Sequence, residues 1–191
     1  MTRFLLASFT LATLIGAAHS ATISGKVAAP TASVVYMDTI PGKTFPSPAQ
    51  HITLDQTGLT FRPHVLVVQQ GATVDFLNSD SVSHNVFWTS IGGNKKLAHN
   101  LGTWPQGETR SFKFDNPGVV PILCNVHPEM SAFLVVSPTP YFAKTDSAGN
   151  YKIENVPDGS YTITAWHENL KPASKKVTVS GDTQADFALS K

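Results

Sequence analysis

The sequence predicts an all-β protein built from β-sandwiches. Glycine and proline are frequent, with 13 of each among 191 residues, and they separate short apolar runs. No stretch repeats apolar residues with the period of 3.6 that marks an amphipathic helix, whereas several runs alternate as strands do. Many short strands divided by turn residues are typical of two sheets packed face to face.

The N-terminal twenty residues are expected to be a signal peptide. Arg3 supplies a positive start, residues 4–17 are apolar, and the small residues Ala18 and Ser20 fit a cleavage site after Ser20. This predicts a periplasmic or otherwise exported protein. The apolar run is shorter than the ~20 residues that a bilayer crossing needs, and no later run reaches that length. No transmembrane segment is therefore expected.

The charge and cysteine content exclude other classes of function. Of 14 Lys and Arg residues one is Arg3, so after cleavage the rest balance the 13 Asp and Glu. Such a chain lacks the basic field that attracts nucleic acid. Its single cysteine, Cys124, cannot form an internal disulfide, although an exported protein meets an oxidising compartment. The thiol is thus expected to have another role.

The middle of the chain, residues 50–137, has the pattern of a complete sandwich. Apolar or alternating runs are bounded by turn residues, and the turn at residues 115–118 leads into one of the longest apolar runs. The predicted strands are residues 64–68, 72–77, 110–114, 119–123 and 132–136.

Three residues with metal-binding side chains lie between the last two predicted strands: Cys124, His127 and Met130. Thiolate and thioether are soft ligands that favour copper, and two His with one Cys and a weak axial Met describe a blue-copper electron-transfer centre. A second imidazole, His84, lies about forty residues upstream at the start of an apolar run. We therefore predict that His84, Cys124, His127 and Met130 bind one copper ion per chain.

These residues resemble the cupredoxins, and the Cys-x2-His-x2-Met spacing is most similar to the amicyanin and pseudoazurin branch. The resemblance covers roughly residues 50–137 and implies a Greek-key, plastocyanin-like β-sandwich. In this family an Asn follows the first His and its side chain ties the two ligand loops together, which implies that role for Asn85. The resemblance also implies that His127 lies near the surface as the electron exit and that the partner is a redox protein.

The end of the chain resembles a second family. Residues 145–153 and 156–166 are similar to the carboxypeptidase regulatory-like modules, which are transthyretin-like β-sandwiches. The opening Ser-Gly-x-Val strand of that family is missing after Pro140 but occurs at residues 24–27, and residues 32–37 predict the next strand.

Residues 138–191 alone are too short for a sandwich of about seven strands. We therefore expect residues 21–41 and 138–191 to form one small sandwich into which residues 50–137 are inserted. The alternative is two consecutive domains, with the first residues as an edge strand of the cupredoxin domain.

The remaining polar and aromatic candidates are expected to be structural or exposed. Core packing is expected for Trp88, and either core packing or partner docking for Trp104. The histidines expected outside the copper site are His51, His64, His99 and His167, and the carboxylates expected in solvent are Asp75, Asp80 and Glu129.

The predicted function is one-electron transfer between redox partners, without enzymatic activity. Four ligands leave no open coordination position, and a multicopper enzyme needs further centres that are usually built from His-x-His pairs, which this sequence lacks. One alternative is a periplasmic copper-delivery protein that uses the same donors in a looser site. Another is a non-redox binding adaptor that acts through the regulatory-like module.

Overall fold

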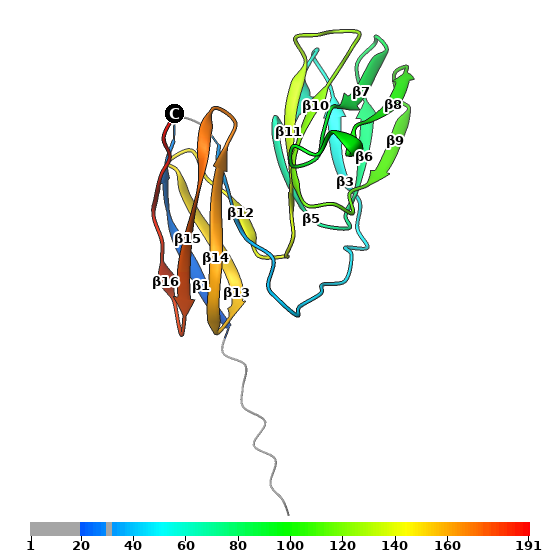
Figure 1. Cartoon of the computed structure of the whole chain (residues 1–191). Helices are drawn as coiled ribbons and strands as arrows, with labels where there is room; N and C mark the ends of the chain where they lie inside the picture. Colours follow the sequence, from blue (N-terminus) through cyan, green and yellow to red (C-terminus); the bar gives the residue numbers. More distant parts are fainter. Residues whose placement is uncertain (1–19, 30–31) are drawn as a thin grey trace, which may run out of the picture.

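The computed structural model describes residues 20–29 and 32–191, which form two β-sandwiches side by side (Figure 1). In this part of the chain the helical content is one short 3-10 helix, η1 (Lys95–Leu97). The all-β prediction is thus confirmed. The predicted signal peptide, apart from Ser20, lies outside the described residues. No described helix has the length and apolar character needed to cross a membrane.

One sandwich combines strands from both ends of the chain. One of its sheets has the order β13-β1-β16, with β17 also paired to β1, and the other has the order β12-β2-β14-β15. The strands are β1 (Ser20–Ala28), β2 (Val34–Met37), β12 (Phe142–Lys144), β13 (Asn150–Pro157), β14 (Gly159–His167), β15 (Leu170–Val179), β16 (Thr183–Gln184) and β17 (Phe187–Ala188).

The Ser-Gly-x-Val pattern has a packing reason in β1. Ile23 and Val27 are buried in the core, as alternation along a strand requires. Between them, Gly25 lies so close to the carbonyl oxygen of Ala185 that any Cβ would collide with it. Glycine therefore allows the C-terminal segment to run directly beside β1.

The sheet pairing bears on the domain boundaries. β1 pairs with β13, β16 and β17, and β2 pairs with β12 and β14. Residues 20–37 thus share both sheets with residues 142–188. On this basis we propose that residues 50–137 are an insertion, with crossings near residues 41–49 and 137–140.

The other sandwich is formed by the middle of the chain. Its sheets have the orders β5-β11-β10-β7-β8 and β4-β3-β6-β9. The strands are β3 (Ile52–Gln56), β4 (Phe61–Arg62), β5 (Val65–Gln69), β6 (Thr73–Asn78), β7 (His84–Trp88), β8 (His99–Trp104), β9 (Thr109–Lys113), β10 (Gly118–Leu123) and β11 (Ser131–Ser137).

Consecutive strands in this sandwich do not always pair. β5 and β6 follow each other after a short turn, yet β5 pairs with β11 in one sheet and β6 with β3 in the other. The turn at Gly71 (φ +85°) therefore carries the chain across the core. Alternation of apolar residues predicts that both segments are strands, but it does not identify their partners.

Aromatic residues fill the core between these two sheets. Trp88 packs on Phe76, Phe112 and Phe114, and both Trp88 and Trp104 are only 1% exposed. The core position of Trp88 is confirmed, and Trp104 is a core residue too.

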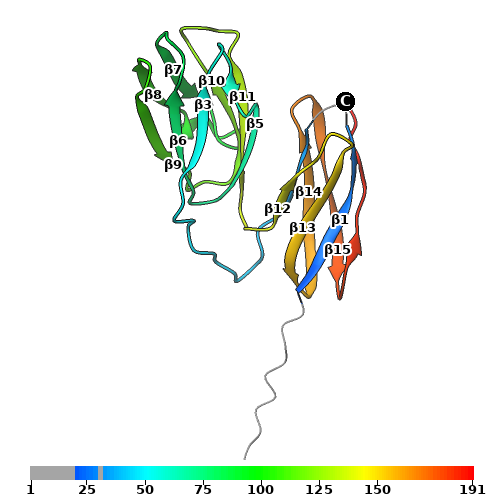
Figure 2. The ribbon, with the colours of Figure 1, turned by 180° about the vertical axis from the view of Figure 1, so that it is seen from behind.

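Seen from behind, the loop between β10 and β11 lies at the end of the sandwich opposite the two interdomain connections (Figure 2). The packed core thus supports the loop between β10 and β11.

The proposed insertion predicts how fragments fold. A chain of residues 138–191 should stay unfolded because it lacks β1 and β2 and exposes their apolar partners. Joining residues 21–41 to residues 138–191 through a short Gly/Ser linker should restore a β-sheet circular-dichroism spectrum and cooperative melting. Residues 50–137 alone should fold and bind copper. Cooperative folding of the isolated C-terminal fragment would contradict the insertion and leave the copper site unaffected.

Candidate metal centre

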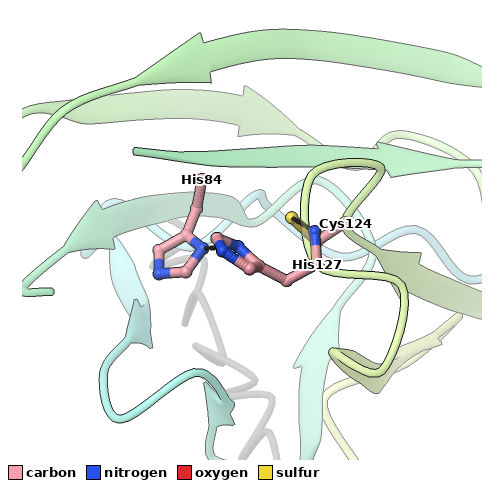
Figure 3. A group of neighbouring side chains, drawn as sticks. All are labelled: His84, Cys124 and His127. Atoms are coloured by element: carbon pink, nitrogen blue, oxygen red, sulfur yellow. Dashed lines mark hydrogen bonds between the residues drawn. The ribbon is translucent and has the colours of Figure 1, made fainter. Parts of the chain in front are cut away.

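Three of the predicted ligands come together at one end of the sandwich formed by the middle of the chain (Figure 3). One ligand atom each from His84, Cys124 and His127 lies within 4.8 Å of the others, and this is the one such group among the described His, Cys, Asp and Glu residues. His84 begins β7, and Cys124 directly follows β10. Because β7 and β10 are neighbours in the sheet, ligands from distant parts of the sequence converge.

The two imidazoles face each other through the same ring atom. Nδ1 of His84 lies 3.0 Å from Nδ1 of His127, and the ring centroids are 4.8 Å apart. His84 is fully buried, whereas His127 is partly exposed. His127 is therefore the member of the group that lies nearest to solvent.

Backbone N–H groups surround the cysteine sulfur. Sγ of Cys124 accepts from the backbone N–H of Asn85 and from that of His127, both at 3.4 Å. These two contacts hold in place the atom that binds metal when a cysteine is a ligand. The link between the two ligand segments thus runs through the Asn85 backbone. Its side-chain amide instead donates to Asn100 and Gly102 of β8, which differs from the tie implied by the family resemblance.

Met130 ends the same loop and is 1% exposed. Its backbone N–H donates to the carbonyl of His127 at 2.9 Å, which closes a tight turn around Pro128. Met130 belongs to the apolar core cluster of this sandwich. The loop is therefore anchored at both ends by buried sulfur side chains, with its exposed residues between them.

Asp80 is a functional candidate that sequence reasoning missed, because we expected it to be solvated. Its Oδ2 accepts from Nε2 of His84 at 2.8 Å, and its carboxylate also accepts from the backbone N–H groups of Gly58 and Leu59. Burial raises the pKa of Asp80, but the hydrogen bonds from Leu59, His84 and Gly58 outweigh this and hold the pKa below its usual value. Asp80 is thus an ionised acceptor for His84.

This contact defines the tautomer of His84. With its proton on Nε2, the ring presents the Nδ1 lone pair towards Cys124 and His127. A carboxylate that orients a metal-binding histidine also raises the basicity of the ligand nitrogen. The only sequence signal for this role was an Asp four residues before the His, in a Ser-rich turn.

A buried amide shapes the turn that presents Asp80. The Asn78 side chain donates to the carbonyls of Val82 and Trp104, and its oxygen accepts from the Asp80 backbone N–H at 3.0 Å. Because Asn78 is fully buried, these bonds are costly to lose. Asn78 therefore fixes the path of residues 78–84 into His84.

The other described histidines, His51, His64, His99 and His167, lie outside this group. His99 packs on Trp88 and Phe112, at the end of β7 opposite His84. His51 pairs with Asp75, and His167 accepts from the backbone N–H of Asn169. His64 contacts Glu168 of the other sandwich.

The donor set and the comparisons with known proteins agree on the metal. Two imidazole nitrogens and a thiolate suit copper. Residues 48–137 match the family of copper binding proteins of the plastocyanin/azurin family, and residues 131–190 match the carboxypeptidase regulatory-like domain. The chain thus combines a plastocyanin/azurin-type copper-binding domain with a regulatory-like domain. Its cofactor is copper, and the group of His84, Cys124 and His127 can hold one ion.

Solved structures with similar folds include amicyanin mutants. An oxidized mutant is 25% identical over 46% of this chain and 82% of its own, with a TM-score of 0.42. A reduced mutant is 23% identical over 52% and 97%, with a TM-score of 0.43. A Cu-containing nitrite reductase from Thermus scotoductus SA-01 is 24% identical over 52% of this chain but 25% of its own, with a TM-score of 0.43.

The role of Asp80 predicts a copper-affinity change. Asp80→Asn keeps the size of the side chain but removes the charge that orients His84, so copper affinity should fall about 10- to 100-fold. Competition with a cuprous chelator measures this. Asp75→Asn is the matched control, because Asp75 accepts from His51 away from the metal group. Equal affinities for the Asp80 variant and the wild type would contradict the role.

Proposed function

We propose that this protein is an exported carrier of single electrons between redox partners, with one copper bound by His84, Cys124, His127 and Met130. The observation that carries the proposal is the burial gradient within one compact group. His84 and Cys124 are closed off from water, whereas His127 reaches the surface. Such a site protects the metal from substrates and leaves one route for electrons.

In this proposal copper supplies the one-electron couple between its cuprous and cupric states. Cys124 would supply a thiolate, His84 and His127 would supply nitrogen ligands, and the Met130 thioether would be the weak ligand that tunes the potential. The protein holds these side chains still. Asp80 fixes the His84 ring, and two backbone N–H groups fix Sγ of Cys124. Little reorganisation is then needed when the oxidation state changes.

The surface around His127 supports docking of a redox protein. The exposed large hydrophobic residues of the described chain are Leu59, Val82 and Val126. All three lie on loops at the metal end: Leu59 contacts Asp80, Val82 lies two residues before His84, and Val126 precedes His127. Apolar side chains around an exposed ligand allow close and brief contact with a partner.

Copper delivery is the second candidate function, because a delivery site could use the same donors. The hydrogen bonds that fix His84 and Cys124 favour the carrier, since a delivery site must release its ion readily. An enzymatic role would need a further centre, and the described residues hold one group of three metal-binding side chains. Electron transfer therefore accounts for more of the local structure than copper delivery or an enzymatic role does.

The carrier proposal predicts an intense visible absorption band. The purified protein should bind one cupric ion per chain and show strong thiolate-to-copper absorption with a matching electron-spin spectrum. Cys124→Ser should abolish the band because a hydroxyl is a poor substitute for a thiolate. A colourless wild-type protein that binds cuprous ion would favour delivery, and several coppers per chain would favour an enzyme.

The ligand roles predict different effects on potential. Met130→Gln should retain copper and lower the reduction potential, because an amide oxygen binds cupric ion more strongly than a thioether does. Protein-film voltammetry measures the shift. His99→Ala is the control and should leave the spectrum and potential unchanged, since His99 lies at the far end of β7. Loss of colour in that variant would refute the ligand assignment.

A further inference from the structure

The two sandwiches touch along an apolar interface. Val34 and Trp166 of the regulatory-like domain pack on Val65 and Val135 of the copper domain, and all four are buried. The centroids of the Phe133 and Trp166 rings are 5.3 Å apart. Packing at this interface, in addition to the two connections, therefore holds one domain against the other.

His64 lies beside this interface and bridges the domains. Its Nδ1 is 3.1 Å from the carbonyl oxygen of Ser131, and its Nε2 is 2.8 Å from Oε2 of Glu168. A carbonyl and a carboxylate are both acceptors, so a ring nitrogen that carries a proton donates to the partner on its own side of the bridge. His64 thus connects the turn after β14 to the first residue of β11.

The bridge ends next to a proposed copper ligand. Ser131 directly follows Met130, and the backbone N–H of Phe133 donates to the His64 carbonyl at 2.8 Å. His64 therefore holds the start of β11 through its side chain and its backbone. Arg62 and Glu129, which have opposite charges, line the same surface hollow as His64 and Met130.

The bridge is expected to act on geometry more than on stability. The His64 side chain is 49% exposed, and exposed ion pairs contribute little to folding. By contrast, a small displacement of Ser131 would be passed on to Met130, because the two residues share a peptide bond. A weak axial contact is sensitive to such a displacement, since no strong bond holds its length.

We propose that Glu168 is a positioning residue for the copper site. Acting through His64, it fixes the Ser131 carbonyl and so sets how closely Met130 approaches the metal. The regulatory-like domain would thereby adjust the reduction potential of the copper domain. This inference rests on the proposed function, because it takes Met130 as the axial ligand.

The first test needs no copper. The full mature chain is labelled with ¹³C in its methionine methyl groups, and Met130 is compared with Met37, which is buried in the core of the other domain. His64→Phe and Glu168→Ala should both shift the Met130 methyl resonance and leave that of Met37 in place. Glu168→Gln should shift it less, because its amide oxygen can still accept from Nε2.

A matched control separates the bridge from any exposed His–carboxylate pair. His51 is 52% exposed and pairs with Asp75 at 3.0 Å in the sheet away from the interface. His51→Phe should leave the Met130 resonance unchanged. An unchanged Met130 resonance in both bridge variants, or an equal shift in His51→Phe, would overturn the proposal.

The second test measures the reduction potential of the copper-loaded chain. Loosening the axial sulfur removes a donor that cupric ion needs more than cuprous ion does, so His64→Phe and Glu168→Ala should both raise the potential. A plain charge effect acts differently, because removing positive charge from the His64 position would lower the potential. A lower or unchanged potential in His64→Phe would therefore contradict the positioning role.

A double variant tests whether Glu168 acts through His64. If it does, His64→Phe combined with Glu168→Ala should have the potential of His64→Phe alone. Additive shifts would show independent actions and overturn the inference. A wild-type protein without the visible band would instead defeat the proposed function, while the copper-free resonance test would still decide whether Glu168 positions Met130.

Discussion

The pairing of β7 with β10 is the interaction on which the metal centre depends. Leu123 of β10 lies opposite Phe87 of β7, so the residues that follow Leu123 and the residues at the start of β7 meet at one sheet end. The backbone N–H of Asn85 then reaches Sγ of Cys124. Without this pairing the buried His84 and the loop of Cys124 and His127 would have no common position.

Polar groups in the neighbouring loops make that position rigid. Asn78 shapes the turn that carries Asp80, and Asp80 joins the His84 ring to the backbone of Gly58 and Leu59. This network links the end of one sheet to the turn between β3 and β4 of the other. Ring orientation is consequently a property of the whole sandwich end, which suits a centre that changes charge without changing shape.

The regulatory-like domain contacts the copper domain close to the loop that carries Met130. Trp166 packs on Phe133 of β11, and Glu168 contacts His64. The His64 ring also contacts the carbonyl of Ser131, the residue that follows Met130. Two connections and an apolar interface therefore place the regulatory-like domain against β11, beside the loop that ends at Met130. Contact between the two domains near the metal-binding loop is a physical reason for both to occur in one chain.

The sequence by itself determined the features that depend on local chemistry. The alternating runs identified strands, the short spacing of Cys124, His127 and Met130 predicted a copper-binding loop, and Ser24-Gly25 predicted the opening strand of a regulatory-like module. These patterns are readable because ligand type, strand period and close backbone approach each act over a few residues.

Only the tertiary structure decided which distant residues meet. The role of Asp80 depends on Gly58 and Leu59, which lie 22 and 21 residues earlier. The Asn85 tie is made by its backbone, and β5 and β6 separate into different sheets. His64 likewise gained its partner from a segment 104 residues away. Such contacts depend on strand order and domain packing, which a local pattern of residues does not encode.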